Sequence, residues 1–287
     1  MDVNLGKYNV TPSLRRLLDI EQVLDREDLL YGLGFYPSTD NFRHACTPCD
    51  LVIFGSFGAD GTHCGFLTDF GAAASLDEAP IVCVAPMNDC PTRVVARNLH
   101  DFLRLLMDDP GLLYNDFESE EDYLAYKKYA AEDDGLFAEK EKAARGKVRK
   151  YLEENFEIPE IENPYQYVRD LAAERKRTVS VQTEDGLGVA VPFRKGEKHI
   201  PFPLDPYNKP DPGALKKYFD SAPVASRLAF IRDLQFYWIV DDHPDVKGIV
   251  TEALRKMGLN DEAERLAPGE PPKNNGDGFF YGGVFTL

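Results

Sequence analysis

One glycine-rich stretch constrains the fold more than any other part of the chain. It reads LVIFGSFGADGTHCGFLTDFG, residues 51–71, and places Gly55, Gly58 and Gly61 at intervals of three. A phosphate-binding loop follows a strand and opens a helix, because free N–H groups at the helix N-terminus hold the anion. Here the next segment, THCGFLTDF, is β-branched and aromatic, and no lysine follows Gly61. The Asp60–Gly61 pair instead predicts a β-hairpin turn, with Gly61 at a positive φ.

The segments around this turn indicate the fold class. DLVIFGS, THCGFLTDF and APIVCVAP, within residues 50–86, are short β-rich runs bounded by Gly, Asp or Pro. Helical periodicity occupies residues 13–34, with Ser13 as the expected N-cap, and returns at 94–107. We therefore expect an α+β protein with a mostly antiparallel sheet and helices packed on it.

The remaining chain predicts helices and one further hairpin. Asn163 and Pro164 begin a helix, as N-cap and first helical residue. No flexible Gly/Ser linker separates a first domain, 1–155, from a mixed region, 156–287, so the two can pack as one unit. Within that region we expect a hairpin over 177–193 across Asp185–Gly186 and an extended loop over 195–213. We expect helices over 222–267, with Trp238 in the core and a helix start at Pro244. Residues 279–287 are expected to form an apolar strand or a tucked-in terminus.

The charge of the chain is acidic and uneven. Its formal net charge is −16; residues 1–160 carry 30 acidic and 16 basic side chains, and residues 161–287 carry 19 and 17. This charge disfavours direct binding to nucleic acid or to an anionic membrane, since both repel it. A basic protein is the partner that such a field attracts.

The compartment follows from what the sequence lacks. There is no apolar run of 18 residues, and the N-terminus has neither the basic nor the apolar region of a signal peptide. The five cysteines are odd in number and all lie between residues 46 and 90. We expect a cytoplasmic protein with reduced thiols, no membrane span and no cofactor.

The central block resembles the SUKH superfamily. The strand and turn in IFGSFGADGTHCGFLTDFG, the strand APIVCVAP and the helical VVARNLHDFLRLLM are similar to the family's central block over residues 13–107. The helix has the family's pattern at Ala96, Leu99, Phe102 and Leu103, whereas Tyr36-Pro37 stands where the family commonly has Leu-Pro followed by tyrosine.

The resemblance implies a SUKH-like α+β domain without catalytic residues. Bacterial members of the superfamily are often immunity proteins that neutralise polymorphic toxins, many of them nucleases, and others are regulators or scaffolds. We therefore expect a non-enzymatic protein that covers a basic toxin domain with an acidic surface; the alternative is a cytosolic scaffold or regulator of the same fold.

The candidate binding surface is the acidic, aromatic segment after residue 111. Its carboxylates can attract a basic partner and its aromatic side chains can anchor it, because aromatic residues contribute disproportionately to interface energy. The alternative is that these acidic residues form only a solvent-exposed helix face that binds no partner. The predicted partner-binding residues are Asp60, Asp69, Tyr114, Asp116, Phe117, Glu118, Glu120, Glu121, Asp122 and Tyr123.

Rival chemistry rests on histidine and cysteine. His44, Cys46 and Cys49 in HACTPC, with Cys64 across the expected hairpin, form the candidate zinc set, although zinc sites usually have a second tidy pair. Thiol redox chemistry is less favoured because Pro48 lies inside the pair. DDHPD, residues 241–245, is a combination that could serve acid–base chemistry, but no Ser or Cys nucleophile is obvious nearby and a helix start at Pro244 is the favoured explanation. A zinc-dependent or hydrolytic enzyme is thus the third hypothesis.

Overall fold

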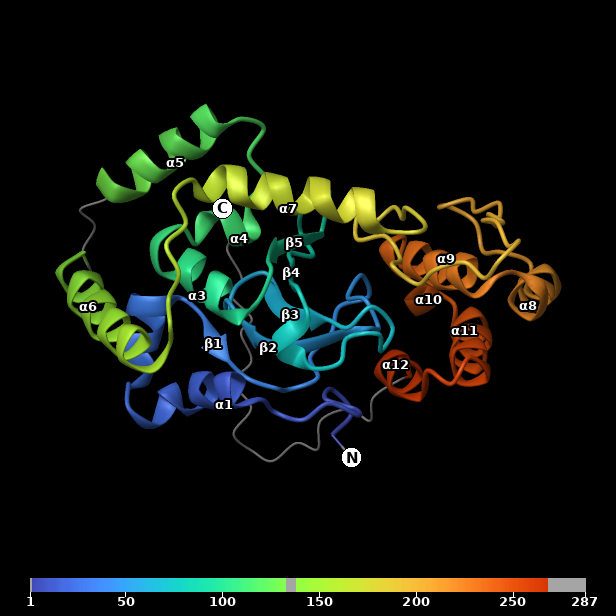
Figure 1. Ribbon diagram of the computed structural model, residues 1–287, viewed down its shortest axis with the longest axis horizontal. Helices are drawn as coiled ribbons and strands as arrows, with labels where there is room; N and C mark the ends of the chain where they lie inside the picture. The colour runs from blue at the N-terminus through green and yellow to red at the C-terminus, as the bar shows by residue number, and fades with distance from the viewer. Residues whose placement is uncertain (1, 133–137, 268–287) are drawn as a thin grey trace, which may run out of the picture.

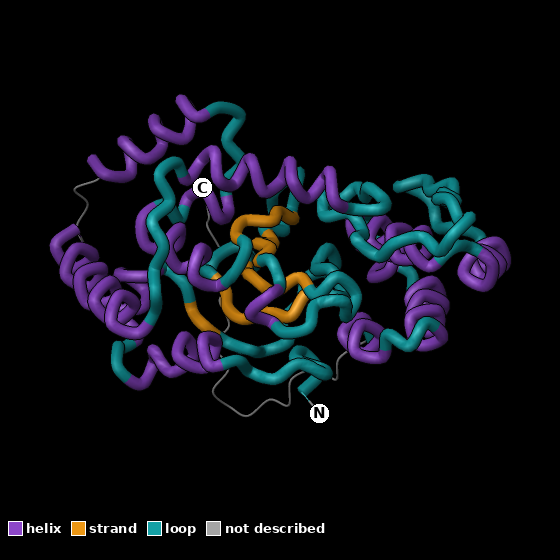
Figure 2. The backbone as a smooth tube through the Cα atoms, viewed as in Figure 1, coloured by secondary structure: helices purple, strands orange, loops and turns teal. Residues whose placement is uncertain are grey.

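The fold is α+β and is built on one antiparallel sheet. The structure, a computed structural model, describes residues 2–132 and 138–267, so the segment 279–287 lies outside the described residues. Five strands follow one another in the sheet in chain order (Figures 1 and 2). They are β1 (Tyr36–Pro37), β2 (Leu51–Ser56), β3 (His63–Leu67), β4 (Ile81–Val84) and β5 (Thr92–Ala96).

The predicted hairpin turn at Asp60–Gly61 is confirmed. Ser56 pairs with His63 at the start of the turn, and Asp60 and Gly61 both have left-handed backbones, with φ of 50° and 68°. A Cβ atom on Gly61 would lie only 2.0 Å from Nε2 of His44. Glycine is therefore required at this position for its backbone conformation and for space.

The helix expected over 94–107 is partly wrong, because its first residues form a strand. Residues Thr92–Ala96 are β5, which pairs with β4, and helix α3 runs from Leu99 to Asp108. Asn98 caps this helix, its side chain accepting a hydrogen bond of 2.9 Å from the N–H of Asp101. The β-branched Thr92, Val94 and Val95 favour a strand, and the N-cap fixes the later helix start.

The N-terminal helical segment is interrupted. It contains α1 (Pro12–Leu18), a 3₁₀ turn (η1, Asp19–Gln22), α2 (Arg26–Asp28) and a π turn (η2, Leu29–Leu33). The N-cap of α1 is Thr11 and not Ser13: the Thr11 hydroxyl accepts from the N–H of Leu14, and Pro12 is the first helical residue.

Four helices lead out of the sheet region. They are α4 (Gly111–Tyr114), α5 (Glu120–Glu132), α6 (Ala138–Asn155) and α7 (Pro164–Thr178). The predicted cap of α7 is confirmed, since Asn163 accepts from the N–H of Gln166 at 2.9 Å. Helix α7 crosses over β5, while α5 lies on the outer side of α7 (Figure 1).

The C-terminal helices gather on one side of the sheet (Figure 1). The loop expected over 195–213 ends two residues early, at residue 211, because Pro212 begins α8. The hairpin expected over 177–193 is reduced to a single bridge between Val181 and Val189. Helix α7 takes the first residues of that expected hairpin. The helices predicted over 222–267 are confirmed, and the group comprises α8 (Pro212–Ser221), α9 (Val224–Phe236), α10 (Ile239–Asp242), α11 (Pro244–Lys256) and α12 (Asn260–Leu266).

In the part of the chain that the structure describes, the hydrophobic interior consists of three clusters. The largest lies on the face of the sheet that carries Phe54 and Phe66, and it extends through α6 to residues 158–168. A small cluster occupies the opposite face, where Leu187 packs against Leu51 and Val82. The third joins the C-terminal helices and reaches into the sheet region through Cys49 and Phe70. The sheet is thus covered on both faces.

The expectation that Trp238 packs in the core is wrong. Its side chain is 45% exposed, and its backbone is left-handed with φ of 63°. Tyr237 and Trp238 connect α9 to α10, and the turn of the chain here removes Trp238 from the apolar stripe formed by Phe230, Ile231 and Leu234.

The N-terminal segment is held by both the sheet and α12. The buried side chain of Asn4 bonds the main chain of Ile53, accepting from its N–H at 2.9 Å and donating to its carbonyl at 2.8 Å. Arg265 of α12 donates to the carbonyl of Asn4 at 2.9 Å, and Asp261 accepts from the N–H of Lys7 at 2.7 Å. Residues near the two ends of the described chain are therefore held together by hydrogen bonds.

Within the described part of the chain, no helix combines the length and apolar character needed to cross a bilayer.

Candidate protein-binding surface

The predicted acidic residues surround the start of α5. Five of them are exposed on the linker 115–119 and the first turn of the helix: Asp116, Glu118, Glu120, Glu121 and Asp122. Ser119 and Asp122 form a reciprocal cap, since the Ser119 hydroxyl accepts from the N–H of Asp122 and the Asp122 carboxylate accepts from that of Ser119, both at 3.1 Å. This cap fixes the linker, and the acidic residues in the first turn stabilise the helix through a favourable interaction with its dipole.

A groove of about 640 Å³ lies between this linker and the β4–β5 turn. One side is the turn itself, where Met87 is 79% exposed and Asp89 is exposed as well. The other side combines Asp116 with the rings of Phe117 and Tyr126. The complete lining is Met87, Asn88, Asp89, Cys90, Asn115, Asp116, Phe117 and Tyr126.

Polar contacts of two side chains fix the walls of the groove. Asn88 donates from Nδ2 to the carbonyl of Tyr114 at 2.8 Å, which ties the turn to the end of α4. Arg93 of β5 donates to the carbonyl of Asn115 and lies 3.6 Å from the carboxylate of Asp116. Burial lowers the pKa of Arg93. Asp116 remains 65% exposed, so its carboxylate is accessible to a partner.

Three other predicted residues have different environments. Tyr123 is buried, and its hydroxyl donates to Asp109, so it belongs to the interior. Asp69 pairs with Arg175 at 2.8 Å on the far side of the sheet, and this ion pair occupies its carboxylate. Tyr114 is half-buried, with its ring 5.2 Å from that of Phe57. Tyr123 is therefore buried away from a partner, and the partly exposed carboxylate of Asp69 is already paired with Arg175, so the structure groups neither residue with the groove.

Asp60 does lie on the same side of the molecule as the groove. The β2–β3 turn and the β4–β5 turn are alternate connections of an antiparallel meander, so both lie at one end of the sheet. The turn residues Met87 to Cys90 were missed because β5 was assigned to a helix. The Asn88–Asp89 pair between two β-branched runs was the available signal.

The candidate zinc ligands are dispersed. Cys64 lies in the largest hydrophobic cluster, Cys49 in that of the C-terminal helices and Cys46 in the small cluster beyond the sheet. Burial raises the pKa of the Cys46 thiol to about 11, which favours the protonated form. Among the described residues, no group of three or more His, Cys, Asp or Glu side chains could hold a metal ion.

Two of the histidines, His44 and His63, lie next to each other. The rings of His44 and His63 are stacked 6.0 Å apart. His63 is buried, with Nδ1 at 2.7 Å from the Gly61 carbonyl and Nε2 at 3.1 Å from the Thr47 hydroxyl. Burial lowers its pKa to about 4. His44 lines a separate cavity of about 210 Å³ with Asp241, but His63 does not. His243 is the N-cap residue of α11.

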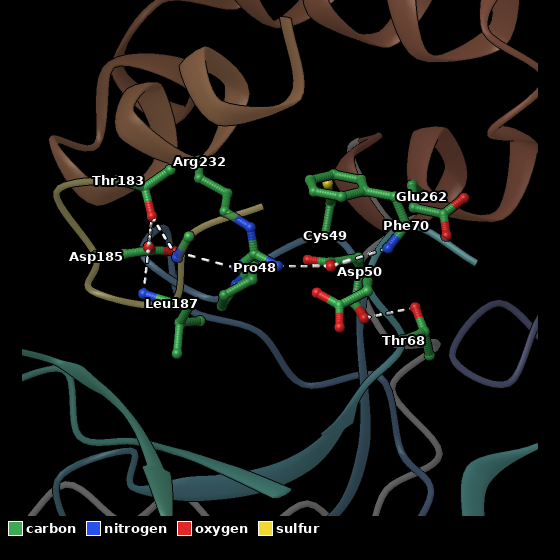
Figure 3. Close-up of polar contacts among 12 residues, drawn as sticks. Pro48, Cys49, Asp50, Thr68, Phe70, Thr183, Asp185, Leu187, Arg232 and Glu262 are labelled. Carbon is green, nitrogen blue, oxygen red and sulfur yellow. Dashed lines mark hydrogen bonds and ion pairs between the residues drawn. The ribbon is translucent and has the colours of Figure 1, made fainter. Parts of the chain in front are cut away.

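A buried ionic cluster joins the sheet to α9 (Figure 3). Arg232 is fully buried and donates to Asp50 at 2.7 Å and to Asp185 at 3.2 Å. Its guanidinium also lies 5.1 Å from the centre of the Phe70 ring. Burial opposes the charge on Arg232, but the two carboxylates outweigh this effect and raise its pKa. Asp50 Oδ1 and Arg232 Nε have no hydrogen-bond partner, but the ion pairs of Arg232 link α9 to Asp50 and Asp185, so we assign the cluster a structural role.

The sequence comparisons leave this geometry as the basis for inference. No protein-family model matches the chain, and no curated protein matches it.

Proposed function

We propose that the chain is a non-enzymatic protein-binding module that neutralises a basic partner, most specifically a nuclease-type toxin domain, as a cytoplasmic immunity protein. The observation that carries this proposal is the groove beside α5. It places the exposed carboxylates of Asp89 and Asp116 next to the exposed Met87 and the ring of Phe117. The resemblance to the SUKH superfamily supports the same class of function.

The proposed mechanism separates attraction from retention. The net charge of −16 steers a cationic surface toward the acidic side, and this increases the association rate at low ionic strength. Lysine or arginine side chains of the partner then pair with Asp89 and Asp116, while an apolar side chain contacts Met87 and Phe117. Desolvated aromatic and apolar contacts slow dissociation. The partner's substrate groove is thereby covered without any chemical step.

The experiment begins by capturing the partner from the native host with tagged full-length protein and measuring its affinity between about 50 and 500 mM salt. We expect the affinity to fall as salt rises, because exposed charges are screened. Asp116→Lys should weaken binding at least tenfold, largely through the association rate. The matched control is Glu264→Lys, which makes the same charge change at an exposed position on α12.

The proposal fails if affinity is independent of salt, or if the two lysine variants weaken binding equally. A partner that has no toxic activity, but binds through Asp116, would instead assign the chain to the scaffold or regulator class. Inhibition of a captured nuclease by the wild-type chain, and its loss in the Asp116 variant, would support neutralisation.

A further inference from the structure

Another cavity, formed by residues far along the chain from the acidic groove, is lined by basic side chains. It encloses about 370 Å³ among the C-terminal helices, which lies within the range of small-molecule sites. Its charged lining consists of Arg194, Arg227 and Lys256, and its lining contains no carboxylate. The remaining lining is apolar: Phe70, Val191, Val224, Leu228, Met257 and Leu259.

The arginines of this cavity retain donor capacity. Among the described residues, no acidic side chain forms an ion pair with Arg194 or Arg227. Arg227 donates from Nη1 to the carbonyl of Phe219 at 2.8 Å, but its buried Nε has no acceptor. A buried donor without an acceptor is costly, and an anionic ligand would satisfy it.

The neighbouring carboxylates are already engaged. Glu197 accepts from the N–H of Arg194 at 2.9 Å and so closes the turn that presents this arginine. Asp220 and Glu252 lie 3.5 and 3.1 Å from the ammonium group of Lys256, and Asp220 and Glu197 line the adjoining cavity described below, not the first one. The two arginines are therefore the groups best placed to receive an anion.

The position of the arginines orients a ligand. An adjoining cavity of about 510 Å³ shares Arg194, Val224 and Arg227 with the first, so the arginines stand where the two cavities meet. Apart from Lys256, the rest of the first cavity's lining is apolar and includes Phe70, which has a left-handed backbone with φ of 56°. Such strain in a bulky residue is maintained only where surrounding structure enforces it.

We propose that this cavity binds a small amphipathic anion, with a single carboxylate or phosphate head at Arg194 and Arg227 and an apolar body against Phe70, Met257 and Leu259. The site is independent of the acidic groove, because it uses none of the same residues. A chain with a net charge of −16 repels small anions elsewhere, so the local cations provide selectivity as well as affinity.

The test is isothermal titration calorimetry of the full chain with octanoate and octyl phosphate, each below its micelle concentration. Octanol and octylammonium have the same apolar body without the anionic head. We expect saturable binding of one molecule of at least one of the two anions, and at least tenfold weaker binding of octanol and octylammonium. The anion that binds more tightly identifies the head group as carboxylate or phosphate.

A pair of arginine variants places the binding. Arg194→Ala removes an exposed side chain and should weaken anion binding at least tenfold, whereas Arg255→Ala, an exposed arginine on α11 outside the cavity, should leave it unchanged. Circular dichroism checks that both variants fold. Equal binding of octanol and octanoate, no saturable binding of either anion, or equal effects of the two variants would overturn the proposal. None of these results bears on partner capture through Asp116.

Discussion

The fully buried His63 is bonded as a neutral imidazole. Its Nδ1–H donates to the Gly61 carbonyl, so its Nε2 accepts from the Thr47 hydroxyl, which itself accepts from the N–H of His44. Protonation of Nε2 would require the Thr47 hydroxyl to accept a hydrogen bond from the ring instead of donating one to it. Desolvation favours the uncharged ring and outweighs the hydrogen bond to the Gly61 carbonyl, which by itself raises the pKa of His63.

His63 should remain neutral in the folded protein down to a pH of about 4. Because its folded pKa is lower than the unfolded value, the unfolded chain binds more protons between about pH 6.5 and 4, and stability falls as pH falls through this window. This one group contributes at most about 1.4 kcal/mol per pH unit. Ring ¹⁵N shifts measured by NMR give the pKa, and a value near 6.5 would contradict the assignment. His63→Gln should flatten the pH dependence of unfolding.

Thiol reactivity should distinguish one cysteine from the other four. Cys90 is exposed at the groove, whereas Cys46, Cys49, Cys64 and Cys83 are buried. A thiol must be accessible and deprotonated to react, and burial opposes both. Ellman's reagent should label one thiol per native chain and five after denaturation, and Cys90→Ser should abolish the native reaction. Rapid labelling of two or more native thiols would show that the buried environments are wrong.

Elements were predictable where a local signal was strong. The Asp60–Gly61 turn, the Asn163 cap and the helices over 222–267 follow from turn chemistry, capping and periodicity, and the structure confirms them. β5 was not found, because the helical spacing of Leu99, Phe102 and Leu103 was extended back over the β-branched Val94 and Val95. Its assignment depends on pairing with β4, which is a tertiary contact.

The candidate groove needed the same tertiary information. Asp116 and Phe117 could be selected from sequence because they are acidic and aromatic, but Met87 and Asp89 join them only when β4 and β5 form a hairpin. The ionic cluster around Arg232 joins residues 182 positions apart, so no local pattern reveals it.

The α9–α10 junction should prefer glycine over alanine. Trp238 holds a left-handed backbone at the end of α9, a position that glycine usually occupies. Trp238→Gly should be more stable than Trp238→Ala by about 1 kcal/mol, because both remove the ring but only alanine retains the strained Cβ. Urea unfolding followed by far-ultraviolet circular dichroism measures the difference. Greater stability of the alanine variant would contradict a left-handed conformation here.

At the scale of the whole molecule, the sheet and the C-terminal helices are joined through buried polar groups. Arg232 reaches Asp50 and Asp185, and Gln235, also on α9, donates to the carbonyl of Thr47 at 2.7 Å and accepts from the N–H of Cys49 at 3.1 Å. Correct packing of α9 therefore depends on these polar contacts with the sheet region. We expect the two parts to unfold together.

Arg232→Met should destabilise the protein by about 3–5 kcal/mol, because it leaves two buried carboxylates without their cation. Asp50→Asn combined with Arg232→Met should cost less than the sum of the two single variants, since it removes one of the uncompensated charges. A double-mutant cycle from urea unfolding measures this coupling. Lys128→Met is an exposed control and should change stability by less than about 0.5 kcal/mol. Additive effects of the first two substitutions would refute a direct pair.

The clasp between Asn4 and α12 has a consequence for biosynthesis. On the ribosome, the first strands emerge long before Arg265 and Asp261 have been polymerised. The contacts of the amino-terminal segment with Arg265 and Asp261 can therefore form only after α12 has left the exit tunnel. A nascent chain stalled before residue 260 should accordingly be sensitive to protease at its beginning, and one released after α12 should resist.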